Sequence, residues 1–207
     1  MKKIRYAIAG SAGRMGRTLI EAVLKNENAT LAAALEHSAS PFLGKDAGEL
    51  VGSPCGVLVS CEIDAALADA DCLIDFTRPE ATLLHLAACK KSGVSIIIGT
   101  TGFSAEGKQA IEAAAQKIPV VYAPNMAVGV NAVFKLLALA AKILHTGYDI
   151  EVIESHHRHK VDAPSGTALR LGEVIAAQLG RDLARDAVYG REGVTGVTRL
   201  RLFDRVS

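Results

Sequence analysis

The chain has 207 residues, of which 50% are hydrophobic, and a formal net charge of +1. It can bury a core in one large domain or two small ones, but it lacks the basic excess that general nucleic-acid binding requires. Its four cysteines form no C-x-x-C pair, so reduced structural thiols are expected.

The apolar stretches predict neither a signal peptide nor a membrane span. Arg5 and Arg14 interrupt the first of them, and Lys135 and Lys142 interrupt the longest, "AVFKLLALAAKIL". We therefore expect a cytoplasmic protein without a membrane partner.

Residues 1–126 alternate short apolar runs with helix-like segments. Strands are expected at 4–10, 30–36, 56–60, 72–76, 95–102 and 119–125, and helices at 16–26, 63–70, 79–93 and 104–117. Residues 38–56 break this rhythm and suggest a loop with room for one helical turn. Apolar strands alternating with amphipathic helices indicate an α/β class, Rossmann-like, doubly wound parallel sheet covered on both faces.

The rhythm changes near Ala123, which indicates a second domain. The expected order is a turn, a helix over 130–144, a strand over 148–155, a histidine-rich loop and a helix over 166–179. We predict a dinucleotide-binding domain at 1–126 and a substrate-binding domain of α+β type at 127–207, with a hinge around 124–129.

Three glycines, Gly10, Gly13 and Gly16, follow the first strand where the first helix opens. Glycines there let the backbone approach a pyrophosphate, and the amides of the helix start receive its charge. The spacing G-x-x-G-x-x-G is looser than the dinucleotide fingerprint and also fits an ordinary strand-to-helix turn. Glu36 closes the second apolar run about twenty residues later, where an acid holds ribose hydroxyls. Together these features predict a nucleotide site.

The choice between NADH and NADPH stays open. His37 and Arg14 could meet a ribose 2′-phosphate, although each also fits an ordinary surface group.

Three further turns end expected strands: "DFTRP" (75–79), "GTTG" (99–102) and "APN" (123–125). Ligands of open parallel sheets bind beyond the carboxyl ends of the strands. Each turn alone fits ordinary turn chemistry. All three on one edge predict a cleft that brings backbone groups against a nicotinamide.

The segment "ESHHRHKVDAPSGTA", 154–168, concentrates cationic and titratable side chains. A zinc site is disfavoured because Arg158 and Lys160 would repel a dication and no cysteine cluster is near, so no metal is expected. A nucleic-acid contact lacks a broader basic face, and a solvated basic loop remains an alternative. We favour a pocket for an anionic substrate, with Lys160 or a histidine as proton donor.

The residues after this loop predict a second seat for negative charge. Ser165 fits an N-cap and Pro164 precedes it, so the amides of Gly166 and Thr167 would open the next helix. Lys160 and His157 near one seat, and these amides at the other, would suit a small dicarboxylate.

The same segment closely resembles the signature of the dihydrodipicolinate reductases, also called 4-hydroxy-tetrahydrodipicolinate reductases, of lysine biosynthesis. "AGSAGRMGR", "DFTRPE", "IIGTTGF" and "APNMAVGVN" are similar to that family's motifs and stand in the family's order, and the resemblance covers about residues 3–193. It implies NAD(P)H-dependent reduction of 4-hydroxy-tetrahydrodipicolinate to tetrahydrodipicolinate, with loss of water, by a homotetramer.

The resemblance also implies roles for particular residues. His156 and Lys160 would be the acid/base and proton-donor pair. The substrate carboxylates would bind His157, Gly166 and Thr167. The pyrophosphate would rest on Gly10, Ser11, Ala12, Gly13, Arg14 and Met15, and the ribose on Glu36. The nicotinamide would be lined by Gly99, Thr100, Thr101, Ala123, Pro124, Asn125 and Met126.

Two positions and the last segment depart from the family's pattern. His37 stands where some relatives carry arginine, and Met126 where phenylalanine is common. The last residues, 197–207, do not resemble the family, so the second domain is expected to be incomplete and to lack strands through which the family forms tetramers. A non-catalytic nucleotide-binding fragment is therefore the alternative function. A second alternative function is that of another NAD(P)-dependent dehydrogenase with a Lys/His acid pair.

Overall fold

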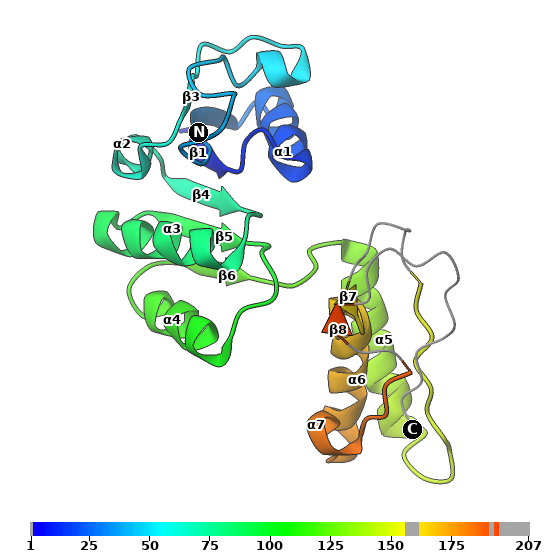
Figure 1. Cartoon of the computed structure of the whole chain (residues 1–207). Helices are drawn as coiled ribbons and strands as arrows, with labels where there is room; N and C mark the ends of the chain where they lie inside the picture. Colours follow the sequence, from blue (N-terminus) through cyan, green and yellow to red (C-terminus); the bar gives the residue numbers. More distant parts are fainter. Residues whose placement is uncertain (1, 156–161, 191–192, 195–207) are drawn as a thin grey trace. The chain divides into compact units, whose positions relative to one another are not determined.

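The computed structural model of the chain describes residues 2–155, 162–190 and 193–194. It has two compact units, Met1–Ala123 and Pro124–Ser207 (Figure 1). Within the described ranges, no helix is long and apolar enough to cross a bilayer.

The first unit is built on a six-stranded parallel sheet in the order β3-β2-β1-β4-β5-β6. Its strands are β1 Ile4–Ala9, β2 Ala29–Leu35, β3 Val59–Ser60, β4 Cys72–Asp75, β5 Ser95–Ile98 and β6 Val120–Tyr122. Its helices are α1 Arg14–Lys25, α2 Ile63–Ala68, α3 Pro79–Ser92 and α4 Ala105–Ala115, with the 3-10 turn η1 Glu49–Val51 inside the expected 38–56 loop. The order is that of a doubly wound dinucleotide-binding sheet, with the chain changing direction between β1 and β4.

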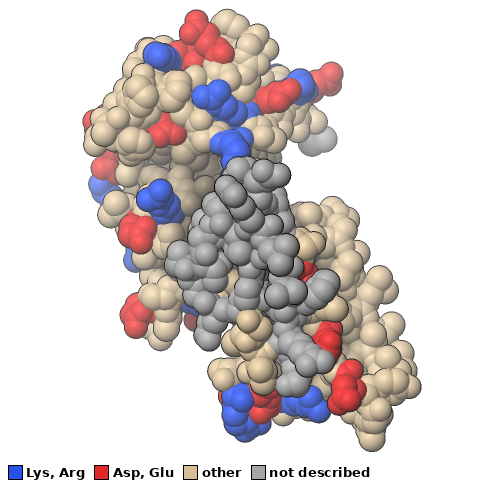
Figure 2. All heavy atoms as spheres, turned by 45° about the vertical axis from the view of Figure 1, so that its right-hand side comes forward, with Lys and Arg blue, Asp and Glu red and all other residues tan. Residues whose placement is uncertain are grey.

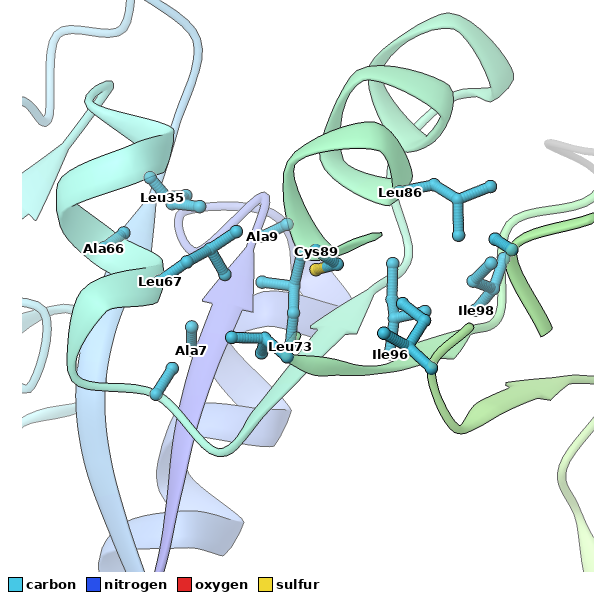
Figure 3. Close-up of a cluster of buried hydrophobic side chains, with 14 of the residues drawn as sticks. Ala7, Ala9, Leu35, Ala66, Leu67, Leu73, Leu86, Cys89, Ile96 and Ile98 are labelled. Atoms are coloured by element: carbon cyan, nitrogen blue, oxygen red, sulfur yellow. The ribbon is translucent and has the colours of Figure 1, made fainter. Parts of the chain in front are cut away.

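The two faces of the sheet bury separate apolar clusters. One joins strand residues such as Leu73 and Ile96 to Leu67 of α2 and Cys89 of α3 (Figure 3). The other joins Ile8 and Ala34 to Ile20 of α1. Because both faces are covered, all four residues of β4 are buried, which explains the unbroken apolar runs in the sequence.

The register of the strands aligns their carboxyl ends. Ala9 is paired with Leu35 on one side and with Asp75 on the other, Asp75 with Ile98, and Ile98 with Tyr122. The residues that follow these five strand ends therefore come to one edge of the sheet; they are Gly10, Glu36, Phe76, Gly99 and Ala123.

The second unit is smaller. It contains α5 Val128–Ile143, α6 Gly166–Leu179, α7 Leu183–Asp186 and a two-stranded antiparallel pair, β7 Asp162–Ala163 and β8 Gly193–Val194. Helices α5 and α6 pack side by side (Figure 1). Ala141 of α5 and Ala168 and Ile175 of α6 form a buried cluster with Val152 from the segment between the two helices.

The predicted strand over 148–155 is wrong. No strand forms there, although Ile150 and Val152 pack inward while Ile153 is 60% exposed. The sequence therefore indicated the two-residue periodicity correctly. A strand also requires a hydrogen-bonded neighbour, and none of the described residues provides one for this segment.

Candidate functional site

The loop between β1 and α1 can be built only with glycine at two positions. Gly10 has φ +67°, and a Cβ there would lie 2.9 Å from Thr77 Cγ2. A Cβ on Gly16 would lie 2.1 Å from the Gly10 carbonyl oxygen. Helix α1 thus starts in close contact with the loop, as a dinucleotide site requires.

The start of α1 offers donors and no acidic side chain. Its N-cap, Gly13, has no capping side chain, and its first turn contains no acid. In the described part of the chain, no hydrogen bond engages the amides of Arg14, Met15 and Gly16. The Ser11 hydroxyl in the same loop is buried and lacks a partner there too. These groups fit the pyrophosphate of a dinucleotide.

Glu36 lies against this loop. Its Oε1 accepts a hydrogen bond from the Ala12 amide at 2.9 Å, and its side chain is only 10% exposed. Because Glu36 engages the Ala12 amide, the donors of this loop that remain for a ligand are the amides at the start of α1. His37 and Arg14, the two candidates for a 2′-phosphate, are both exposed.

The turn after β5, Gly99–Gly102, is fixed by contacts with the end of β4. The Gly99 amide donates to the Asp75 carbonyl at 2.8 Å, and a Cβ on Gly99 would lie 2.0 Å from the Phe76 ring. Thr100 is only 4% exposed, whereas Thr101 is exposed.

The turn after β6 is shared between the units. The Ala123 amide donates to the Ile98 carbonyl at 3.2 Å within the first unit. Pro124, Asn125 and Met126 belong to the second unit, where Asn125 Oδ1 accepts from the Ala127 amide at 2.9 Å.

Sequence reasoning missed a buried polar network under this edge. Asp75 and Thr77 were considered only as parts of a turn, and Thr82 and His85 of α3 not at all. Asp75 Oδ2 lies 2.7 Å from His85 Nδ1, and Asp75 Oδ1 accepts from the Thr77 hydroxyl at 2.6 Å. The available signal was an ionisable residue ending the apolar run "CLID", followed by a threonine and a histidine three residues apart on one helix face.

In the second unit, Ser165 caps α6 as predicted. Its Oγ accepts from the Ala168 amide at 2.9 Å and donates to Glu154 Oε1 at 2.5 Å. Among the described residues, no hydrogen bond engages the amides of Gly166 and Thr167. This helix start can therefore accept a carboxylate.

His156, His157 and Lys160 lie outside the described residues, and so does the histidine cluster of the zinc alternative. In the ranges that are described, no three metal-ligating side chains converge. Lys and Arg are interspersed with Asp and Glu over the described surface seen in Figure 2.

A cavity of about 380 Å³ lies away from this edge. It is lined by Lys3, Asn26, Thr30 and Cys55 among others, around the amino end of β2. Since ligands of such sheets bind at the carboxyl ends, we do not assign it to the candidate site.

A doubly wound parallel sheet with a glycine loop after β1 and an acid after β2 is the architecture of dinucleotide-binding proteins. The family described as "Dihydrodipicolinate reductase, N-terminus" matches residues 4–126, and "Dihydrodipicolinate reductase, C-terminus" matches residues 129–206. The chain belongs to the dihydrodipicolinate reductase family.

Individual relatives agree. The chain is 65% identical over 196 residues to the 4-hydroxy-tetrahydrodipicolinate reductase of Aromatoleum aromaticum, covering 95% of this chain and 71% of that protein. It is 63% identical over 196 residues to the one of Dechloromonas aromatica, covering 95% and 73%. Among solved structures, a dipicolinate-bound dihydrodipicolinate reductase from Paenisporosarcina sp. TG-14 matches with a TM-score of 0.69 and 33% identity, over 93% of this chain and 72% of that one.

These findings confirm the predicted family, the Rossmann-like α/β class and the reductase function. They do not favour the alternative of a non-catalytic fragment. The C-terminal match extends to residue 206 and so includes most of the 197–207 segment, which lies outside the described residues.

Proposed function

We propose that this chain reduces 4-hydroxy-tetrahydrodipicolinate to tetrahydrodipicolinate with NADH or NADPH, in the diaminopimelate route to lysine. The observation that carries the proposal is the shared edge of five strand ends, which gathers the glycine loop, Glu36 and the Gly99 turn in a chain of this family.

The cofactor would lie along this edge. Gly10 to Met15 would hold the pyrophosphate, with the amides at the start of α1 as donors. Gly99 to Thr101 and Ala123 to Met126 would line the nicotinamide. When bound, the reduced nicotinamide supplies the hydride.

We propose that both cofactors are accepted. The Glu36 carboxylate suits the free ribose hydroxyls of NADH, and its bond to the Ala12 amide keeps it at the loop. The exposed Arg14 and His37 could neutralise the 2′-phosphate of NADPH. Comparing KM for the two cofactors in the wild type and in His37→Ala tests this assignment.

The substrate is a small dicarboxylate, and a relative has been solved with dipicolinate bound. The amides of Gly166 and Thr167 would hold one carboxylate, because the positive end of the α6 dipole lies there. His157 and Lys160 would attract the other.

The reaction adds one hydride and one proton to the substrate and releases water, so a proton donor must stand beside the acceptor carbon. His156 and Lys160 would form this acid pair, since histidine titrates near neutral pH and a lysine ammonium is both acid and carboxylate ligand. We also propose that the protein is located in the cytoplasm.

The test is substrate-dependent oxidation of NADH and NADPH by the purified chain. His156→Ala and Lys160→Ala should each lower kcat about 10²–10⁴-fold while nucleotide affinity is retained. Unchanged turnover would reject these roles. If the wild type binds NADH without oxidising it, the fragment alternative is the better one.

A further inference from the structure

The buried polar network around Asp75 lies next to the edge formed by the five strand ends. It is located between β1 and β4, where the strand order reverses. Asp75 is the last residue of β4, the strand adjacent to β1, and its side chain is fully buried. A buried carboxylate is costly unless it is fully hydrogen-bonded. The hydrogen-bond partners of Asp75 therefore indicate which parts of the fold this carboxylate holds in place.

Each oxygen of Asp75 has its own partners. Oδ1 accepts from the Thr77 amide at 2.8 Å, from the Thr77 hydroxyl at 2.6 Å and from the Thr100 hydroxyl at 3.4 Å. Oδ2 lies 2.7 Å from Nδ1 of His85, whose side chain is 11% exposed. Although burial raises the pKa of Asp75, hydrogen bonds from His85 and Thr77 outweigh burial and hold this pKa below its ordinary value. Asp75 is therefore an ionised acceptor at neutral pH, and its neighbours must donate.

This requirement fixes the hydroxyl protons. The Thr100 hydroxyl donates to Asp75 and accepts from the Thr82 hydroxyl at 2.9 Å. Thr82 is itself fully buried. The Thr100 side chain is thus occupied inside the protein, whereas Thr101 of the same turn is exposed.

The network also reaches the glycine loop. Thr77, held by Asp75 through both its amide and its hydroxyl, places its Cγ2 against Gly10, where a Cβ would come within 2.9 Å. One carboxylate therefore connects the loop after β1, the turn after β4 and the turn after β5.

We propose that Asp75, supported by His85 and Thr82, is a positioning residue that fixes the Gly99–Thr101 turn relative to the glycine loop and thereby sets the place of the nicotinamide. Thr100 then acts through its buried hydroxyl as a positioning residue and not as a side-chain ligand of the cofactor. The inference rests on the proposed function, because it assigns the Gly99–Thr101 turn to the nicotinamide.

The first arm of the test measures binding alone. Thr100→Val and Thr82→Val remove single hydroxyls at nearly constant shape, and Asp75→Asn removes the charge. Each should raise the Kd of NADH about tenfold but leave the Kd of ADP-ribose, which lacks the nicotinamide, within about twofold of wild type. Equal changes for both ligands, or none, would overturn the inference.

Asp71→Asn is the matched control. Asp71 immediately precedes β4, as Asp75 ends it, and it is also hydrogen-bonded, to the Arg5 side chain at 2.9 Å. It lies at the opposite end of the strand, so its loss should lower stability without separating the two affinities. If Asp75→Asn does not fold, the two valine variants decide.

The second arm measures kcat per NADH-binding site. Misplacement of the nicotinamide should lower this value roughly ten- to a hundredfold in Thr100→Val. A purely structural role would reduce the number of binding sites and leave kcat per site unchanged, which would also overturn the inference. If the wild type binds NADH but shows no turnover with substrate, the proposed function fails, and the binding arm still decides the inference.

Discussion

The two units of the chain hold their polar groups in different ways. In the first, the register of the parallel strands brings the glycine loop, Glu36 and the Asp75 network to one edge, above two buried clusters. In the second, the cluster of buried residues has four members, and the candidate carboxylate seat depends on local bonds around Ser165. The candidate nucleotide site is thus organised by long-range pairing and the candidate carboxylate seat by capping of one helix.

The largest effect should follow from breaking the glycine loop. Gly16→Ala would place a Cβ 2.1 Å from the Gly10 carbonyl oxygen, so the loop or α1 must move. We expect the Kd of NADH to rise more than a hundredfold, because backbone approach to the pyrophosphate is lost. Isothermal titration with NADH checks this.

Gly129→Ala is the control for this substitution. Gly129 also lies in the first turn of a helix, α5, but a Cβ there meets nothing within 4 Å. Alanine should stabilise this helix by up to about 1 kcal/mol and leave NADH affinity unchanged. If Gly16→Ala bound NADH as tightly as Gly129→Ala does, the loop would not hold the cofactor.

The next effect concerns the substrate side. The Ser165–Glu154 bond joins the two ends of the segment that carries His156 and Lys160, and Ser165 also caps α6. Ser165→Ala should lower the free energy of unfolding of the second unit by about 1–2 kcal/mol and raise the substrate KM several-fold. Hydrogen exchange in α6 and steady-state kinetics measure the two effects.

Ser104→Ala provides the comparison within the first unit. Ser104 caps α4 in the same way, accepting from the Gly107 amide at 3.2 Å. Ser104→Ala should lower the free energy of unfolding by a similar amount and leave substrate KM unchanged. Glu154→Gln keeps an acceptor for Ser165 and should be milder than Glu154→Ala. Equal substrate KM in Ser165→Ala and Ser104→Ala would contradict a special role for the loop ends.

These contrasts explain what the sequence could predict. The strand and helix segments of the first unit, the glycine loop and the Ser165 cap follow from local patterns: apolar runs, glycine spacing and a serine three residues before the amide it binds. The Asp75–His85 pair depends on which segments meet in space. So does the lack of a described strand partner for residues 148–155. The pair brings together residues ten apart, and its link to Thr100 spans twenty-five. No local period encodes such contacts.

A smaller effect should appear on acidification, mainly in the first unit. The hydrogen bond from the Arg5 side chain lowers the pKa of Asp71 to about 2, and that from the Cys55 amide does the same for Asp46. In the unfolded chain an aspartate titrates near about 3.9. The folded pKa values are depressed, so both groups stabilise the fold above about pH 4 and lose this contribution as the pH falls towards about 2.

Asp46→Asn and Asp71→Asn should therefore flatten the pH dependence of unfolding over this range, with little difference from wild type near pH 2. Hydrogen exchange of sheet amides at several pH values measures it. A slope unchanged in both variants would assign acid sensitivity to other groups.

The smallest effect concerns the reactivity of the cysteine thiols and needs no substitution. It tests the packing of the first unit, which contains all four cysteines. Burial raises the pKa of Cys72 to about 11 and that of Cys89 to about 12, so at pH 8 only about one Cys72 thiol in a thousand is ionised, and fewer at Cys89. Cys55 and Cys61 are only partly buried. In a thiol titration of the native chain, Cys61 and then Cys55 should react, and Cys72 and Cys89 only on unfolding. Rapid labelling of Cys89, which lies between α3 and the sheet in Figure 3, would mean that the first unit opens locally.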